Sequence, residues 1–596
     1  MGGIKVKNEV GEVRPGQLIT TYGPGAIMDS INDSLVILDI NYWGDNLEEI
    51  YDNRLSGFLK KDLFKKIPTK GKKDLPAIPF PNYHVCSNLK CRRLFDIRDR
   101  FDMNSYLEKG PICPRCNKKA YPSRFIVSCE NENHLDDFPW HWWAHKRSHT
   151  SCRGELQLTS SGKDSGLSSL IVKCLSCGDS NNMRLATQKK YFSNLQCEGN
   201  HPHRMNSKEP KQSCGKIIPL QRGASNVYFP VLRSAISIPI SVENVNKYYE
   251  FFMRESKDFK YAEELFGERG LKRAYSMKEE AHSLFDTFEN FLENWNKFNI
   301  EISRRAKDAE EINKYEQIKE IEYEALTGFT GSIQKGKDFK AEEESIPSDL
   351  TKYIKKIVKA QRLKEILVLL GFTRNEVPEP DVKNPSSIVW LGDTKTNWLP
   401  AVEIFGEGIF VEFNRVSLIN WAESNKEVFS RSENYKKMYK AYLDEKGWKH
   451  QSEKDVIFVL MHTLSHLLMK EMSLQCGYSS SALKERIYYN EKMSGILIYT
   501  GSSDQEGSLG GLVEMGEINN FRKLLLTSLE EAKFCSNDPK CSMQEPEQGN
   551  YINGASCFAC TMLPETACET GNMLLDRSLL INTMESNITP FFEGLI

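Results

Sequence analysis

Sixteen cysteines are the residues in this 596-residue chain whose spacing most clearly indicates a chemistry. A thiolate is a soft ligand, and four thiolates at about 2.3 Å complete a tetrahedral shell around Zn²⁺. The pair Cys86 and Cys91 is followed 21 residues later by the pair Cys113 and Cys116, which is the arrangement of a zinc ribbon. Because four protein ligands leave no position for water, we expect this first zinc site to be structural.

Six more cysteines lie between residues 129 and 214, and their spacing leaves two pairings open. In the pairing that we favour, one ion is held by Cys174, Cys177, Cys197 and Cys214, and another by Cys129, His134, His145 and Cys152. In the alternative, Cys129 and Cys152 join Cys174 and Cys177, while Cys197 and Cys214 pair with His201 or His203. Both predict small units that need zinc because they bury too little apolar surface to fold alone.

Five cysteines near the C-terminal end of the sequence predict a further structural zinc site, and they are Cys535, Cys541, Cys557, Cys560 and Cys568. Four-coordinate zinc needs only four of them, so one is spare. A catalytic cysteine is disfavoured, because no histidine follows His466 and acidic residues surround Cys568. We therefore expect three or four structural zinc ions in the whole chain.

His462 and His466 lie four residues apart, which places both on one face of a helix. Zinc proteases use this spacing with a glutamate as the second residue of the motif, but Thr463 stands there in this chain. A metal-dependent hydrolase or nuclease would need Glu485 or Asp504 as a further ligand and an open position on the ion. Such histidines are more often hydrogen-bonded core residues, so catalysis is our alternative hypothesis.

Charge is distributed unevenly along the chain. Residues 84–235 hold 24 Lys and Arg against 13 Asp and Glu, a net +11, whereas the whole chain is at −2. A basic module favours contact with a nucleic-acid backbone, although it could instead attract the acidic remainder of the chain. Within "DDFPWHWWAHKRSH" and shortly after it, we expect Lys146, Arg147 and Arg153 to contact phosphates. We expect Trp140 and Trp143 to be core residues.

From the elements that must position these residues, we predict an α+β multidomain protein. We expect a strand and loop region at 1–83, a zinc-rich, ribbon-like basic module at 84–241, a helical region at 242–394 and a C-terminal α/β domain with a structural zinc site at 395–596. Aromatic residues three or four apart in 285–295 indicate an amphipathic helix, and "AVEIFGEGIFVEF" is typical of a hairpin.

Several functions are excluded or disfavoured by what the sequence lacks. It contains no Walker motif, which disfavours nucleotide hydrolysis by this chain. It also has neither an apolar run of the roughly 18 residues that a membrane helix needs nor a signal-peptide core at its start. We therefore expect a cytoplasmic protein that does not contact the membrane.

Several long blocks resemble the DrmB family of the bacterial DISARM anti-phage system, and they are "RPGQLITTYGPGAIMD", "HLDDFPWHWWAH", "LQRGASNVYFPVLRSAISIP", "HTLSHLL", "GYSSSALKERIYY", "GSLGGLVE" and "SCFACTMLPETACETGNMLLDR". The resemblance implies a non-catalytic partner of a DrmA-like helicase, in a complex that engages phage DNA. The C-terminal part is also similar to a cysteine-containing domain appended to some repair helicases. That similarity implies zinc ligation by Cys557, Cys560 and Cys568, with Cys541 or Cys535 as the fourth ligand.

Overall fold

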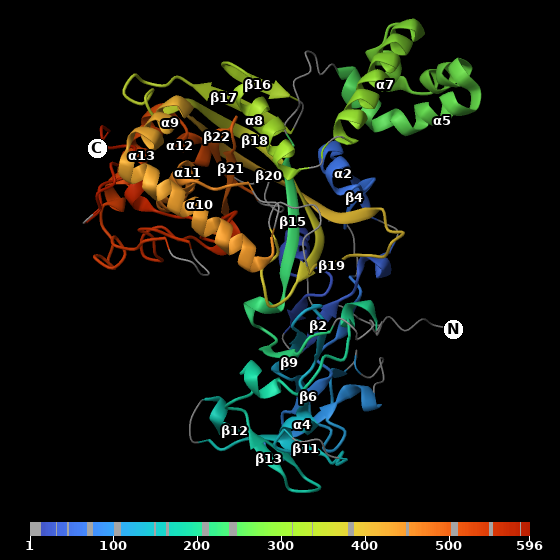
Figure 1. Cartoon of the computed structure of the whole chain (residues 1–596). Coiled ribbons are helices and arrows are strands. Elements are labelled where there is room, and N and C mark those ends of the chain that lie inside the picture. Colours follow the sequence, from blue (N-terminus) through green and yellow to red (C-terminus); the bar gives the residue numbers. More distant parts are fainter. Residues whose placement is uncertain are drawn as a thin grey trace.

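The computed structural model describes residues 13–595 except for 31–32, 45–46, 68–74, 101–105, 107–108, 148–150, 163–165, 206–213, 238–246, 311, 313, 336–337, 380–386, 449–451, 502–510, 547–551 and 585. A ten-stranded sheet runs through the middle of the molecule (Figure 1). Along its path the strands are β16 (Ser332–Lys335), β17 (Phe339–Glu344), β18 (Ile354–Thr373), β20 (Trp398–Phe413), β22 (Ser494–Thr500) and β21 (Leu483–Tyr489).

Segments far apart in the sequence add edge strands to this sheet. Strands β15 (Phe229–Ile236) and β19 (Val389–Trp390) pair with β18, and β4 (Leu63–Lys66) lies parallel to β20 and also pairs with β3 (Glu48–Ile50). The N-terminal region, the zinc-rich module and the C-terminal half are therefore joined through one hydrogen-bonded structure.

The segment "AVEIFGEGIFVEF" forms part of the single long strand β20, so the predicted hairpin is wrong. Its glycines allow a close approach between strands instead of a turn. A Cβ on Gly406 would lie only 1.7 Å from the backbone oxygen of Thr500 on β22, which only glycine can avoid.

Helices occupy only the first part of the region that we expected to be helical. They are α5 (Lys247–Ser276), α6 (Glu279–Leu284), α7 (Phe288–Glu310) and α8 (Tyr315–Thr327), and the strands of the large sheet begin at Ser332. Phe285, Phe291 and Trp295 are completely buried against one another, which confirms that the aromatic pattern is a core. In Figure 1 the α5 and α7 helices project from the upper right of the molecule.

The zinc-rich module consists of short strands and few helices, and it lies at the lower end of Figure 1. One sheet contains β13 (Ser180–Asn182), β12 (Leu170–Cys174), β11 (Leu156–Ser160), β7 (Arg93–Asp96), β6 (Tyr83–Cys86) and β8 (Ala120–Pro122). A second contains β10 (Leu135–Asp137), β9 (Phe125–Cys129) and β14 (Ile217–Gln221). A third, before the module, contains β1 (Ile27–Asp29), β2 (Ser34–Ile37) and β5 (Ala77–Pro79). In the described part of the first 150 residues, short helices include α1 (Pro15–Thr20), α2 (Asn53–Leu59) and α4 (Trp140–Ala144).

The C-terminal part packs around α11 (Val456–Cys476), together with α9 (Arg415–Ser424), α10 (Lys426–Lys446), α12 (Gly511–Met515) and α13 (Ile518–Ala532). Helix α11 has apolar residues on nearly all of its faces. This pattern fits its position, because α10, α13 and strands β21 and β22 surround it. Asp455 caps its first amides, and Gly477 ends it in the left-handed conformation. Among the described residues, no helix combines the length and apolarity that membrane crossing demands.

Candidate metal centres

Fifteen of the sixteen cysteines fall into five clusters of four potential ligands each, and Cys476 alone lies outside them. The clusters are defined here as A (Cys86, Cys91, Cys113, Cys116), B (Cys129, His134, Cys197, Cys214), C (His145, Cys152, Cys174, Cys177), D (Cys535, Cys541, Cys557, Cys560) and E (His462, His466, Glu485, Cys568). In each cluster the four ligand atoms lie within 4.8 Å of one another.

Cluster A brings together the four cysteines that the ribbon spacing predicts. Its sulfurs lie 3.4 Å apart in the Cys86–Cys116 pair and 3.8 Å apart in the Cys91–Cys113 pair. A tetrahedral zinc ion with Zn–S bonds of about 2.3 Å places its sulfurs about 3.8 Å apart, whereas a disulfide needs about 2.05 Å. The donor set therefore fits a four-thiolate metal site.

The backbone of cluster A has the turn that each cysteine pair needs. Arg92 and Asn117, which directly follow Cys91 and Cys116, have φ values of 46° and 57°. This left-handed conformation turns the chain so that both sulfurs of a pair face the same point.

Clusters B and C correct both pairings that the spacing suggested. Cys129 and His134 join Cys197 and Cys214, whereas His145 and Cys152 join Cys174 and Cys177. The cause is the pairing of β9 with β14, in which Cys129 lies opposite Ile217 and therefore close to Cys214. Short-range spacing cannot reveal this contact, because the two strands are more than 80 residues apart.

In cluster C, the histidine ligand His145 directly follows helix α4. The Trp143 indole donates to the backbone oxygen of Asn182 on β13, and this bond docks α4 beside β12. The His145 Nδ1 lies 2.6 Å from the His141 backbone oxygen, so its Nε2 is directed at Cys177 Sγ, 3.2 Å away. Fixing one ring nitrogen in this way orients the other for a metal.

Cluster D contains four of the five C-terminal cysteines, and the spare one is Cys568. The sulfur separations are 3.4 Å for Cys535–Cys557, 3.6 Å for Cys541–Cys560 and 3.7 Å for Cys557–Cys560, again close to the spacing of a tetrahedral zinc site. The ligand set implied by the resemblance, with Cys568 as a partner of Cys557 and Cys560, is therefore wrong.

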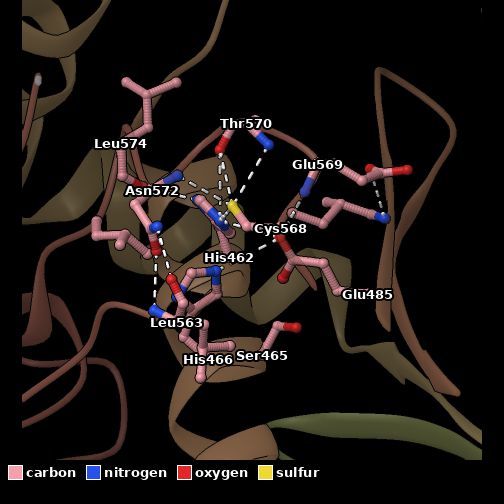
Figure 2. Close-up of polar contacts among 12 residues, drawn as sticks. His462, Ser465, His466, Glu485, Leu563, Cys568, Glu569, Thr570, Asn572 and Leu574 are labelled. Carbon is pink, nitrogen blue, oxygen red and sulfur yellow. Dashed lines mark hydrogen bonds and ion pairs between the residues drawn. The ribbon is translucent and has the colours of Figure 1, made fainter. Parts of the chain in front are cut away.

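Cys568 lies instead in cluster E, beside both histidines of α11 and Glu485 of β21 (Figure 2). Glu485 Oε1 lies 3.1 Å from His462 Nε2 and 3.5 Å from His466 Nε2, and Cys568 Sγ lies 3.2 Å from His462 Nε2. The other glutamate or aspartate that we considered, Asp504, lies outside the described residues. The sequence signal for Cys568 was its excess over the four cysteines that one zinc ion needs.

The charges in cluster E are strongly coupled. Burial lowers the pKa of His466, but the Glu485 carboxylate and Cys568 outweigh it and raise the pKa to about 9. Burial raises the pKa of Glu485, but His462 and His466 outweigh it and hold the pKa well below its usual range. A buried carboxylate thus faces groups that must supply positive charge.

The predicted nucleic-acid contacts lie on the surface of the zinc-rich module. Lys146, Arg147 and Arg153 are exposed, and the Arg147 guanidinium lies over the Tyr191 ring at 4.8 Å. Trp140 and Trp143 are each 1% exposed, which confirms that they are core residues. The three cations are therefore exposed on the module that contains this aromatic core.

Comparisons with known proteins match two domain families and one full-length relative. Residues 14–229 match the family model of a domain of unknown function (DUF8724), and residues 464–561 match that of the MrfA Zn-binding domain. The second match contains all four cysteines of cluster D and ends before Cys568. Over 572 residues the chain is 54% identical to the DISARM protein DrmB of Bacillus paralicheniformis, which covers 96% of this chain and 100% of that protein. The chain therefore belongs to the DrmB family of DISARM proteins.

Proposed function

We propose that this chain is a zinc-stabilised subunit of an anti-phage defence complex, in which it binds a DrmA-like helicase and helps that helicase to engage DNA. The observation that carries the proposal is the family membership over 96% of the chain. The absence of a Walker motif from the sequence supports a division of labour in which another subunit uses ATP.

The zinc-rich module is our candidate DNA surface. Clusters A, B and C lie within residues 86–214, inside the segment with a net charge of +11. Metal clusters can hold exposed cations in fixed positions without a large apolar core. Contacts to phosphates through Lys146, Arg147 and Arg153 would be independent of base sequence and sensitive to salt.

Charge reversal tests the DNA surface. In the complete complex, the triple variant Lys146→Glu, Arg147→Glu and Arg153→Glu should bind duplex DNA about 100-fold more weakly at 0.15 M salt, because three phosphate contacts are lost. The slope of log Kd against log salt should fall by about 3. Fluorescence anisotropy with labelled DNA measures both quantities.

The matched control reverses three exposed lysines of α10, Lys426, Lys437 and Lys440, and so makes the same change in net charge. This control should leave the affinity within about threefold of the unmodified complex, since distant charges are screened beyond about 8 Å at this salt. Equal affinity losses in both triple variants would mean that DNA binding depends only on the net charge of the complex. That result would contradict the proposed surface.

The helicase partner is tested by co-purification. When a tagged form of this chain is co-expressed with the DISARM helicase, we expect both to elute together from the affinity resin and from a sizing column at 0.3 M salt. The same experiment without DNA, after nuclease treatment, should give the same result. A chain that elutes alone while the helicase is present and folded would contradict the proposal.

A further inference from the structure

Cluster E has the donor geometry of a fifth metal site, separate from the four cysteine-rich clusters. Helix α11 presents His462 and His466 on one face, β21 supplies Glu485, and the loop that follows cluster D supplies Cys568 (Figure 2). A tetrahedral zinc ion with Zn–N bonds of about 2.0 Å and a Zn–S bond of about 2.3 Å requires donor separations of roughly 3.3 to 3.6 Å. Three of the six separations, those of Glu485 Oε1 from the two histidine Nε2 atoms and of Cys568 Sγ from His462 Nε2, are 3.1, 3.5 and 3.2 Å, and all four donor atoms lie within 4.8 Å of one another.

Both imidazole rings are oriented so that Nε2 is a ligand atom. His462 Nδ1 lies 3.1 Å from the backbone oxygen of Leu574, and His466 Nδ1 lies 2.9 Å from that of Thr561. A backbone oxygen only accepts hydrogen bonds, so each Nδ1 carries a proton, and a ring that is neutral when metal binds directs the lone pair of Nε2 into the cluster. Metal-bound histidines in proteins are usually fixed in this way.

Without a metal ion, only protons on the histidine rings would offset the charge of the buried Glu485 carboxylate. The side chains of His462, His466 and Glu485 have no solvent exposure. Among the described residues, His466 Nε2 and Glu485 Oε2 have no hydrogen-bond partner. Buried polar atoms without partners are costly, and a divalent cation bound through Glu485 Oε1 would satisfy His466 Nε2.

We propose that His462, His466, Glu485 and Cys568 together bind one structural Zn²⁺ ion. Two neutral imidazoles, one carboxylate and one thiolate balance the charge of a divalent ion, so the buried site is electrically neutral. The donor set of two nitrogens, one oxygen and one sulfur suits zinc. On binding, the Cys568 thiol releases its proton to solvent.

The surroundings of Cys568 match those of cysteines in the other clusters. The amides of Thr570 and Asn572 donate to its sulfur at 3.4 and 3.2 Å. The amide two residues after the cysteine does the same at Cys197 of cluster B and Cys535 of cluster D, at 3.2 and 3.4 Å. Cys568 therefore has the same kind of amide donor as cysteines in two other clusters.

Four protein ligands complete the coordination of this ion, so its role is structural and the hydrolase hypothesis lacks the open position that it needs. The ion connects α11 and β21 to the segment 561–574, which directly follows cluster D. Lys470 of α11 supports the same junction by donating to the backbone oxygen of Ala559 at 3.2 Å. The fifth ion would therefore connect the segment that follows cluster D to the buried helix α11.

The number of ions per chain tests this proposal. Full-length protein, purified without chelators in zinc-containing medium, should contain five zinc ions per chain by elemental analysis. The Cys568→Ser and Glu485→Gln variants should each contain four. The matched control is Cys476→Ser, which removes the half-buried cysteine that belongs to no cluster and should retain five.

Anomalous diffraction at the zinc edge from the unmodified protein decides the matter if the variants fail to fold. A peak between His462, His466, Glu485 and Cys568 is the expected result. Four zinc ions in the unmodified protein with no peak at that position would overturn the proposal and leave a metal-free network of shared protons. Neither measurement depends on DNA or helicase binding. A negative result for the fifth ion would therefore leave the proposed function untouched, and the reverse also holds.

Discussion

A chain in which Cys174 and Cys177 are both replaced by serine should lose the folded structure of the zinc-rich module. Cluster C joins β12, the helix α4 and the segment before β11, and Cys174 is itself part of the hydrophobic core there. A structural zinc site contributes apparent binding free energy of about 10–16 kcal/mol. That is as large as the total stability of a typical domain, about 5–15 kcal/mol, so the module cannot remain folded without it.

Limited proteolysis with mass spectrometry measures this effect. We expect rapid cleavage between residues 140 and 200 in the double variant, while β18, β20 and β22 stay protected by the large sheet. Cys476→Ser serves as the control because it removes a thiol without touching a cluster, and its cleavage pattern should equal that of the unmodified chain. A double variant as resistant as this control would show that cluster C does not hold the module together.

Ligand identity was more predictable than ligand pairing, and the reason is physical. A Cys-x2-Cys pair is a local structure, because a single turn brings both sulfurs to one point, and Cys174 with Cys177 illustrates it. Which remote residues complete the shell depends on strand pairing. Cys214 reaches Cys129 only because β14 lies against β9, and that contact is set by the tertiary fold.

The end of the helical region was predicted at residue 394, although the strands of the large sheet begin at Ser332, and the cause is again tertiary structure. Strand β18 contains "IKKIVKAQRLKEILVLL", which is rich in Lys and Leu, residues with a high helix propensity. In the fold it lies between β17 and β20, with β15 and β19 at its other end, and most of its side chains are buried. Pairing with four other strands outweighs local propensity here.

Cluster E shows what a sequence can and cannot predict about a site. The spacing of His462 and His466 on a helix predicted a shared face, and Glu485 was one of two acidic candidates. The spacing left open which of the five C-terminal cysteines is spare, and the resemblance to the helicase-appended domain placed Cys568 with Cys557 and Cys560. Its true neighbours come from a helix about 100 residues earlier, which only the packing of α11 against the C-terminal segment brings close.

A buried ion pair next to this site gives the second large effect that we expect. Arg486, which follows Glu485 on β21, donates to both carboxylate oxygens of Glu322 on α8, at 2.6 and 2.9 Å. Glu322 is completely buried, and Arg486 is 2% exposed. Burial lowers the pKa of Arg486, but the Glu322 carboxylate outweighs it and holds the pKa well above its usual range. Arg486 therefore remains charged in the interior.

Glu322→Gln should destabilise the contact between α8 and β21 by about 3–5 kcal/mol, because it leaves the Arg486 charge buried without its partner. Glu322 also accepts from the backbone amide of Ile236 at 2.9 Å, so the same change weakens the attachment of β15. Native-state hydrogen exchange of the α8 and β21 amides reports this local opening free energy.

The matched control is Glu433→Gln, which removes the carboxylate of an exposed pair with Lys436 and should cost at most about 1 kcal/mol in the same assay. Adding Arg486→Met to Glu322→Gln should destabilise the chain less than the sum of the two single changes, since the unpaired buried charge is then gone. Strictly additive effects would contradict direct coupling between the two residues. The coupling matters for cluster E, because a β21 strand that is loosened at Arg486 no longer holds the neighbouring Glu485 carboxylate against His462.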